Sequence, residues 1–415
     1  TVSVDGNIRS IQNEAFYSCD NLESVTLSGT LLQCGSAVFG YCDNLKSVTI
    51  QALFPPKASN NLAPNDVCVL YAPEWTMDKY KLATGWSGFK NLQPITGIYP
   101  TQITAYKEES LSIPDNGLPQ DYLPNMTIAY DESDRNNIYV GKLTVRGEMP
   151  LTLATFEMQQ TRDTRTMTSL INNGNLSANK IVTNITMSAN TWHYLTFPYD
   201  VKVSDIVNDG GDWIICYYDG EARAQADFGN TWKTVPYDSI LHAGEGYIWH
   251  STNGKFTVPS VDNDNRNLIF AKDTRYIQLD EHAASTTANY GWNLIGNPFP
   301  CYYDTRFMEF TSPITVRNGN SYAAYSPIDD SYILMPNEAF FVQCSADNNV
   351  VGFTLVGRQT NNTVRELTAA PSVSRSASNI RSVLNLYLEN NSFVDHTRLV
   401  VNENASMEYE IDCAI

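Results

Sequence analysis

The sequence contains few charged residues, and basic residues are the scarcer kind. Only 17% of its 415 residues carry charge, whereas an average globular protein has about 25%. Acidic residues outnumber basic ones by 45 to 27, which gives a formal net charge of −18. Proteins that bind nucleic acids or anionic lipids gather Lys and Arg against the phosphates. The composition therefore argues against both kinds of partner.

Cysteine and long hydrophobic runs are scarce as well. Eight cysteines are too few for a disulfide scaffold in a chain of this length, and none shows the C-x-x-C spacing of a zinc site. We expect seven of them to be structural, mostly as small buried apolar side chains: Cys19, Cys34, Cys42, Cys216, Cys301, Cys344 and Cys413. A hydrophobic fraction of 42% excludes both wholesale disorder and an integral membrane protein. The length predicts about two to four domains.

Catalytic and metal-binding motifs are also missing. The sequence contains no G-x-S-x-G, no P-loop and no dinucleotide fingerprint. The five histidines are dispersed, without metal-ligand spacing: His193, His242, His250, His282 and His396. His193 stands between Trp192 and Tyr194 in an expected strand, which favours a hydrogen-bonded structural role. We therefore predict no catalytic residue, no cofactor and no metal.

What the sequence does contain is a short repeat near its N-terminus. Residues 16–27 read Phe-Tyr-Ser-Cys-Asp-Asn-Leu-Glu-Ser-Val-Thr-Leu, and residues 39–50 read Phe-Gly-Tyr-Cys-Asp-Asn-Leu-Lys-Ser-Val-Thr-Ile. The two segments are in register at a period of 23 residues, which lies within the range of leucine-rich repeats. We expect a short strand in each unit, at Val25–Leu27 and Val48–Ile50. Stacking of the units would bury their Leu, Val, Phe and Cys side chains.

The string Ala-Phe-x-x-Cys-Asp-Asn-Leu-x-Ser-Val-Thr, which begins at Ala15, resembles the BspA-type leucine-rich repeats of bacterial surface proteins, especially in Bacteroidetes. The second copy departs from the pattern only at Val38. A third strand is expected near Val67–Tyr71, followed within residues 72–89 by a short helix that ends on a Gly-Trp turn and caps the stack. Since about three repeats are the minimum for stability, we expect the tail of a longer array. The chain begins without Met and stops inside an apparent strand, so both ends are expected to be cut.

A second, weaker self-similarity lies in the middle of the chain. The matching segments are 192–200 with 292–300, and 243–249 with 336–342. Each copy has a strand that begins with Trp and ends at Pro, followed later by a turn with Glu before an aromatic strand. We interpret the copies as two related β units, about 185–260 and 288–357, packed as one sandwich or as a pseudo-symmetric pair. The string Trp-Asn-Leu-Ile-Gly-Asn-Pro-Phe-Pro also resembles a motif of exported Bacteroidetes proteins.

The predicted fold class is mainly β, with a short N-terminal leucine-rich-repeat array followed by one or more β-sandwich domains. The expected divisions are a leucine-rich-repeat tail with its cap at 1–95, a β-rich domain at 96–184, a duplicated β-sandwich region at 185–366, a linker at 367–380 and the start of a truncated β unit at 381–415. One helix candidate interrupts the β pattern, at Thr166–Asn172.

Two acidic features were weighed as sites. Glu245 and Glu338 recur at equivalent positions of the duplication, and a pair of carboxylates can serve glycoside hydrolysis. Turn geometry explains their recurrence better. The segment Asp262-Asn263-Asp264-Asn265 has the oxygen density of a calcium loop but lacks the Gly and the distal Glu of an EF-hand. Such clusters also form ordinary hairpin turns, so calcium binding by Asp262 and Asp264 stays open.

These features favour a non-enzymatic binding or adhesion protein that presents a repeat surface on a β-rich platform. Its expected location is secreted or on the outer membrane exterior, and its expected partner is a host or bacterial surface protein or a glycan. One alternative is carbohydrate binding by the β domains, because the chain contains 24 Tyr and 7 Trp whose rings can stack on sugars. The other is a divergent hydrolase. The ligand and the oligomeric state are left open.

Overall fold

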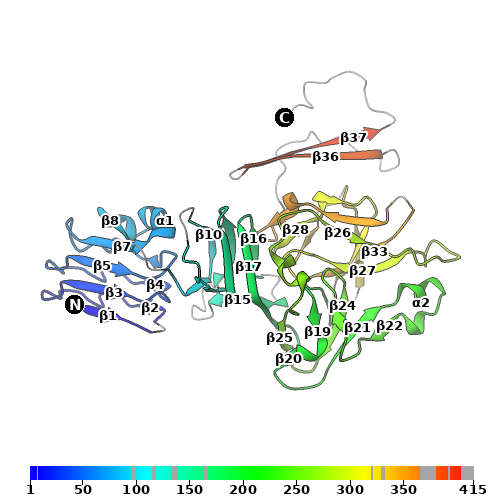
Figure 1. The fold of residues 1–415 in the computed structure, drawn as a ribbon, viewed down its shortest axis with the longest axis horizontal. Coiled ribbons are helices and arrows are strands. Elements are labelled where there is room, and N and C mark those ends of the chain that lie inside the picture. Colours follow the sequence, from blue (N-terminus) through cyan, green and yellow to red (C-terminus); the bar gives the residue numbers. More distant parts are fainter. Residues whose placement is uncertain are drawn as a thin grey trace. The chain divides into compact units, whose positions relative to one another are not determined.

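The computed structural model of the chain consists of two compact units and is mainly β, as predicted (Figure 1). The structure describes residues 1–6, 8–95, 99–114, 118–131, 139–162, 167–318, 321–328, 332–346, 348–364, 380–390 and 393–402, the last two ranges as backbone. Unit 1 comprises Thr1–Gln159 and Asn172–Thr183. Unit 2 comprises Gln160–Ile171 and Asn184–Ile415. The predicted linker lies outside the described residues apart from Ile380, as do residues 403–415.

Residues 1–95 form a solenoid-like stack with two parallel sheets. Each of the first three coils contributes one strand to each sheet. The first sheet contains β1 (Val2–Val4), β3 (Ser24–Leu27), β5 (Ser47–Ile50), β7 (Val69–Pro73) and β8 (Asn91–Ile95), and the second contains β2 (Ser10–Ile11), β4 (Gln33–Cys34) and β6 (Lys57–Ala58). Val25 pairs with Val48, which is the 23-residue period of the sequence. The strands expected in the three repeats are confirmed as β3, β5 and β7. The second, two-residue strand of each coil was not predicted.

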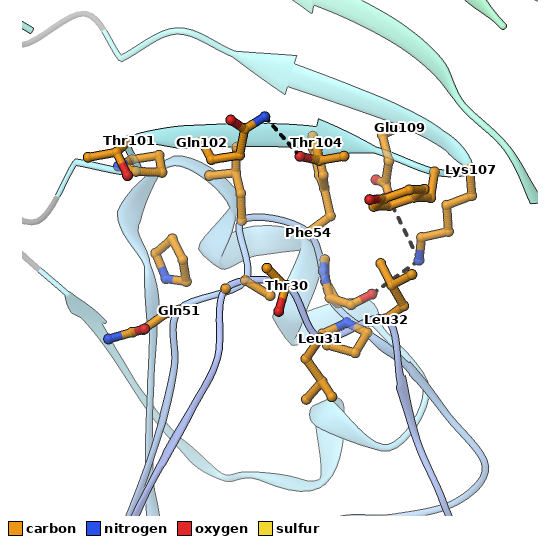
Figure 2. Close-up of a pocket in the computed structure, with 18 of the residues that line it drawn as sticks. Thr30, Leu31, Leu32, Gln51, Phe54, Thr101, Gln102, Thr104, Lys107 and Glu109 are labelled. Atoms are coloured by element: carbon orange, nitrogen blue, oxygen red, sulfur yellow. Dashed lines mark hydrogen bonds and ion pairs between the residues drawn. The ribbon is translucent and has the colours of Figure 1, made fainter. Parts of the chain in front are cut away.

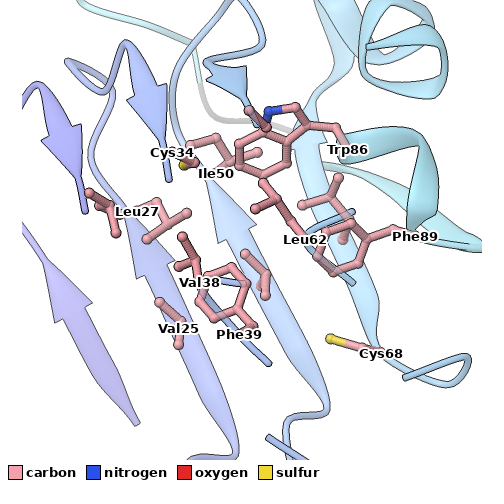
Figure 3. Close-up of a cluster of buried hydrophobic side chains, with 14 of the residues drawn as sticks. Val25, Leu27, Cys34, Val38, Phe39, Ile50, Leu62, Cys68, Trp86 and Phe89 are labelled. Atoms are coloured by element: carbon pink, nitrogen blue, oxygen red, sulfur yellow. The ribbon is translucent and has the colours of Figure 1, made fainter. Parts of the chain in front are cut away.

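The interior of the stack holds the apolar positions of the repeat (Figure 3). Strand side chains alternate, so Val25 and Leu27 are buried while the residues between them face outward. The rings of Phe16 and Phe39 stack with centroids 5.8 Å apart and planes inclined by 8°. In the next repeat the position of Phe39 is taken by Leu62, which is also buried. One apolar column therefore runs through successive repeats.

The turns of the stack repeat their backbone conformation as well. Glu14 and Ala37 have φ values of 60° and 50°, and Ser18 and Tyr41 have 53° and 56°. Both pairs are one period apart, although none of the four is glycine. Backbone amides of the turns bond to neighbouring repeats. Phe16 N donates to Val38 O at 3.0 Å and Ser18 N to Gly40 O at 2.8 Å, while Ser36 N donates back to Asn13 Oδ1 at 2.7 Å. These bonds hold neighbouring repeats together outside the sheets.

A short helix and a Gly-Trp turn lie between β7 and β8, in the segment where a short helix was predicted. Helix α1 (Met77–Leu82) contributes the buried Tyr80, whose hydroxyl donates to Ala52 O at 2.6 Å. Gly85 has a φ of 83°, and a Cβ at this position would clash with Asn60 O. The turn places Trp86 in the interior, where its Nε1–H donates to Pro56 O at 2.6 Å. The left-handed turn thus requires glycine so that the indole can enter the core.

The rest of unit 1 also contains parallel strands. One sheet follows the order β17-β15-β11-β9, with β9 (Gln102–Ala105), β11 (Asn125–Ile128), β15 (Pro150–Thr161) and β17 (Asn175–Thr186). The other pairs are parallel β10 (Glu108–Ser112) with β14 (Lys142–Arg146) and antiparallel β12 (Tyr130–Asp131) with β13 (Tyr139–Val140).

The helix predicted at Thr166–Asn172 is wrong over its described part. Residues Ser169–Asn172 form strand β16, and residues 163–166 lie outside the described residues. The amide of Leu170 donates to Pro300 O at 2.8 Å, and Leu170 is buried. A partner 130 positions away in the sequence therefore overrides a weak local preference for helix.

Unit 2 is built mainly from antiparallel strands. Two four-stranded sheets follow the orders β18 (Trp192–Leu195), β24 (Tyr247–Ser251), β21 (Trp213–Tyr218), β22 (Trp232–Thr234) and β27 (Trp292–Gly296), β33 (Ala339–Gln343), β30 (Ile314–Asn318), β31 (Ser321–Tyr325). The smaller groups are β19 (Val201–Lys202) with β23 (Ile240–Leu241); β20 (Val207–Asn208) with β25 (Lys255–Pro259); β26 (Arg275–Gln278), β34 (Val350–Phe353) and β29 (Met308–Glu309); β32 (Ile333–Leu334), β28 (Tyr302–Asp304) and β35 (Arg358–Gln359); and β36 (Ile380–Asn390) with β37 (Phe393–Asn402). Helix α2 spans Gly220–Ala224.

Two strand pairs of unit 2 share one register. The matched pairs are Trp192 with His250 and Leu195 with Tyr247 in the first, and Trp292 with Gln343 and Ile295 with Phe340 in the second. The turn residue before the recurring Glu has positive φ in both copies, 84° at Gly244 and 59° at Asn337. Side chains of both four-stranded sheets enter one apolar cluster that contains Tyr194 and Phe341. The β-sandwich predicted for residues 185–366 stays a prediction.

The two copies also contact each other reciprocally. Bridges join Leu195 to Glu338 and Ile295 to Glu245, and amides donate from Thr196 to Asn337 O at 3.1 Å and from Gly296 to Gly244 O at 2.8 Å. Each copy thus offers the same backbone groups to the other. This exchange fixes the positions of both recurring turns.

The described cysteines are free, and six of the seven are buried: Cys34, Cys42, Cys68, Cys216, Cys301 and Cys344. Cys19 is half-buried, so its predicted burial is only partial, and Cys413 lies outside the described residues. Burial raises the pKa of Cys34 to about 12, which keeps this thiol protonated and unreactive at neutral pH.

Candidate functional site

The first candidate surface is the outward face of the first sheet, which we call the repeat face. Parallel register places five side chains in one row across it: Ser3, Thr26, Thr49, Tyr71 and Gln93. A neighbouring row contains Ser24, Ser47, Val69 and Asn91. None of these nine side chains is charged. The repeat face is therefore a continuous, uncharged and mostly polar surface about 20 Å wide, given strands about 4.8 Å apart.

The second candidate is a groove in unit 2, which we call the aromatic groove. It has a volume of about 500 Å³ and is lined by Trp192, Tyr194, Cys216, Trp232, Ile248, Arg317 and Tyr322. Trp192 and Tyr194 share one face of β18 because side chains two apart in a strand point the same way. Their side of the sheet also carries Ile248 and Cys216, which are paired in register. Arg317 and Tyr322 come from the hairpin of β30 and β31, where they face each other.

The groove has a buried floor and exposed walls. Tyr194, Cys216 and Ile248 are buried, whereas Trp192 is 38% exposed and Tyr322 is 55% exposed. The hydroxyls of Tyr194 and Tyr322 lie 2.6 Å apart in a hydrogen bond. Burial, together with this bond, raises the pKa of Tyr194 well above its ordinary value. The Tyr194 phenol is therefore neutral at physiological pH, and its hydrogen bond holds the Tyr322 side chain in place.

Arg317 is the one charged side chain among the described residues that line the groove. Its Nη1 donates to Trp192 O at 2.8 Å, and its guanidinium lies 5.4 Å from the centre of the Tyr194 ring. These contacts hold a positive charge against an aromatic wall. The abundance of Tyr and Trp in the sequence indicated that aromatic rings could form a stacking surface. No sequence signal identified Arg317 or Tyr322 as part of it.

A third hollow lies in unit 1, between the repeats and residues 99–109 (Figure 2). It encloses about 460 Å³ and has apolar walls that include Leu31, Leu32 and Phe54. Its charged lining residues are Lys57, Lys107 and the buried Glu109. The Glu109 oxygens lie 3.0 Å from Lys79 Nζ and 3.3 Å from Lys107 Nζ. The carboxylate is thus neutralised by two lysines. This cavity offers an apolar lining rather than reactive groups.

The recurring carboxylates each bond within their own turn. Glu338 is buried, and its Oε2 accepts from the amide of Met335 at 2.7 Å while its Oε1 accepts from the Tyr332 hydroxyl at 2.8 Å. Glu245 Oε2 accepts from the hydroxyl of Tyr247 at 2.6 Å. These are the bonds that a structural role in the turn requires.

The acidic segment at residues 262–265 binds the carboxylate of Asp200 through its side-chain amides. It does not arrange its own oxygens as ligands for a cation. The side-chain amides of Asn263 and Asn265 both donate to Asp200 Oδ2 at 2.9 Å, and Asp262 pairs with Arg266. Within the described residues, no group of three or more His, Cys, Asp or Glu side chains is placed to hold a metal ion. No sequence signal connected this segment with Asp200.

Asp200 is a buried carboxylate with several donors. Besides the two amides, the backbone N–H of Ala243 donates to its Oδ1 at 2.9 Å, and His242 Nδ1 lies 3.9 Å away. Burial by itself would raise the pKa of Asp200, but the bonds from Asn265, Ala243 and Asn263 outweigh it and hold the pKa below the ordinary value. The ionised form therefore ties residues 262–265 to the part of the chain directly before β19.

We expect Asp200→Ala to lower the free energy of unfolding by about 2 kcal/mol at pH 7, because several donors lose a charged acceptor. A depressed folded pKa stabilises the protein above the ordinary Asp pKa of about 3.9, and this contribution is lost as pH falls through the folded value. Urea unfolding at pH 7 and pH 3 measures both effects. The wild type should lose more stability than the variant over this interval. Equal losses, or an equal effect of exposed Asp264→Ala, would contradict the role of Asp200.

The histidines stay dispersed in the structure. The four with described side chains have different neighbours. His193 bonds to the carbonyl of Ser188 at 3.0 Å, and His242 lies near Asp200. His250 packs against the ring of Trp192, and His282 lies near Glu221 and Asp280. The side chain of His396 lies outside the described residues. His193 is hydrogen-bonded, as its position in the strand predicted.

The comparisons with known proteins bear on the N-terminal stack. Residues 1–56 match the family model of the BspA type leucine rich repeat region (6 copies). This segment is similar to BspA-type leucine-rich repeats. The match confirms the resemblance of the Phe-x-x-Cys-Asp-Asn-Leu string, and the stack continues beyond it to β8, where the strand offset shortens to 22 residues. Neither curated proteins nor solved structures gave a match to the chain.

The described helices are short. No helix within the described residues has the length and apolarity needed to cross a bilayer.

Proposed function

We propose that this protein is a non-enzymatic binding or adhesion protein, secreted or exposed on the cell surface, whose repeat face contacts a partner protein. The observation that carries the proposal is the uncharged repeat face, with its row from Ser3 through Tyr71 to Gln93. Protein interfaces are depleted of charge at their centre and enriched in Tyr. The BspA-type repeats of residues 1–56 support a surface location and a bacterial, Bacteroidetes-like source.

The shape of the repeat face suits a protein ligand better than a small molecule. The face is a row of parallel strands rather than a hollow, and stacked repeats offer extended surfaces of this kind. Residues 96–184 and 185–366 would then serve as the β-rich platform that carries the repeats. The duplicated region fits a β-sandwich because side chains of both four-stranded sheets enter the cluster around Phe341.

A catalytic role has less support. Glu245 and Glu338, the residues weighed for hydrolysis, bond to Tyr247 and to the Met335 amide within their own turns. An absence of enzymatic activity is accordingly part of the proposal. Release of reducing sugar or of peptide from a substrate panel would overturn it.

The binding proposal is tested with a double variant of the repeat face. Thr26→Lys with Thr49→Lys places two positive charges at the centre of the row, where a partner would have to bury them unpaired. Binding of the intact chain to an array of purified host matrix proteins and bacterial surface proteins is measured by interferometry. We expect the wild type to bind at least one protein, and the double variant to bind it at least tenfold more weakly.

The matched control adds the same charge elsewhere in unit 1. Ser110→Lys with Ser112→Lys uses two outward positions of β10 and should leave binding unchanged. The proposal fails if no protein on the array binds, or if the repeat-face variant binds as tightly as the control.

Carbohydrate binding by residues 185–366 is the second candidate function. The aromatic groove favours it, because the exposed rings of Trp192 and Tyr322 resemble the stacking surfaces that pyranose rings require.

A further inference from the structure

We propose that the aromatic groove binds a sugar residue that carries a carboxylate, a uronic or sialic acid. The inference rests on the second candidate function, sugar binding, and adds the site and the chemical class of the ligand. It is independent of the repeat face, which belongs to unit 1. Three features of the groove carry it: exposed aromatic walls, a single positive charge and side chains that are already held in place.

The walls provide the stacking surface. The apolar C–H face of a pyranose ring packs on an indole or phenol ring, which supplies a large apolar area at low entropic cost. Trp192 and Tyr322 are the exposed rings of the groove, and Trp232, which also lines it, is half-buried. Tyr194, Cys216 and Ile248 close the floor beneath them. The volume of about 500 Å³ lies within the usual range of small-molecule sites.

The charge selects the kind of sugar. Arg317 supplies the formal charge of the described lining, and a planar guanidinium matches the geometry of a carboxylate. The protein as a whole has a net charge of −18, so a carboxylate ligand needs a positive group such as Arg317 at its point of contact. A carboxylate would gain a charge-assisted hydrogen bond from this guanidinium, whereas a neutral sugar would gain only ordinary hydrogen bonds.

The groove is also preorganised for such a ligand. Arg317 is anchored by its 2.8 Å bond to Trp192 O, and Tyr322 by its 2.6 Å bond to Tyr194. The ring of Tyr194 lies 5.9 Å from those of both Trp232 and Phe341, in edge contacts. The wall residues therefore lose little freedom on binding, which favours affinity.

The test compares acidic sugars with uncharged counterparts of the same shape. The intact chain is titrated calorimetrically with sialyllactose, with a hyaluronan oligosaccharide and with oligogalacturonate, each beside its methyl ester. The ester keeps the ring faces and removes the charge. We expect at least one acid to bind about tenfold or more tightly than its ester, and the preference to shrink as salt is raised.

Variants of the groove separate its two contributions. Arg317→Gln should weaken binding of the acid about ten- to hundredfold and leave the ester within about twofold, while Arg317→Lys restores part of the preference. Trp192→Ala should weaken both forms about tenfold. The matched controls Arg275→Gln and Tyr237→Ala lie in unit 2 outside the groove and should leave both affinities unchanged.

The outcomes distinguish the two proposals. If acid and ester bind equally, sugar binding stands and the acidic class is overturned. If Arg317→Gln keeps the full preference for the acid, the groove is not the site. If neither acid nor ester of any pair binds, both the inference and the sugar-binding candidate fail.

Discussion

Removing the indole of Trp86 is expected to destabilise the repeat stack by about 3–5 kcal/mol. Trp86 is 1% exposed, contacts the edge of Tyr80 at 5.4 Å between ring centres and stacks on Phe89 at 6.4 Å. Replacing a buried Trp by Ala leaves a cavity, and the loss of Nε1 also leaves Pro56 O without its donor. The buried side chain thus contributes both packing and a hydrogen bond.

Denaturant unfolding of Trp86→Ala followed by circular dichroism measures this loss. Hydrogen exchange should place the loss in β5 and β7 of the stack. The control is Leu82→Ala in the neighbouring helix α1, where the leucine is 85% exposed and should contribute less than about 0.5 kcal/mol. Similar stabilities of the two variants would contradict the proposed role of the Gly-Trp turn.

Phe341→Ala is expected to cost unit 2 a similar amount, about 3–5 kcal/mol, because this ring is the centre of an aromatic cluster. Its ring centre lies within 6.2 Å of five others: Tyr194, Tyr218, Trp232, Trp292 and Tyr322. Three of these residues line the aromatic groove. The variant should therefore lose sugar affinity together with stability.

Thermal unfolding of Phe341→Ala is compared with that of Phe228→Ala. Phe228 is 56% exposed, so its removal should change stability by less than about 0.5 kcal/mol. Hydrogen exchange of β18 and β33 should rise only in the first variant. If Phe341→Ala unfolds like the wild type, the cluster does not hold the two sheets together.

The repeat stack was predictable from sequence because its contacts are local and periodic. Phe16 and Phe39 stack, and Val25 pairs with Val48, at the same separation of 23 residues. The 23-residue period of the sequence therefore predicts directly which residues contact each other in neighbouring repeats. The second strand of each coil has only two residues, such as Ser10–Ile11, which is too short for an alternating pattern to show.

Unit 2 was harder to predict because its contacts join distant segments. Leu170 bonds to Pro300 and became part of a strand instead of a helix. The aromatic groove combines Trp192 with Tyr322, 130 positions later, and exposure of these rings depends on how the sheets pack. Abundance of aromatic residues is visible in a sequence, but their position at a surface is not.

The reciprocal contact between the two copies in unit 2 resembles the interface of a symmetric dimer. Leu195 forms a β-bridge with Glu338, and the equivalent Ile295 forms one with Glu245. Each half therefore makes the same backbone contact with the other. In an isologous dimer two separate chains would satisfy such a contact, each dependent on the concentration of the other. Joined in one polypeptide, the halves meet at a high effective concentration that dilution does not lower.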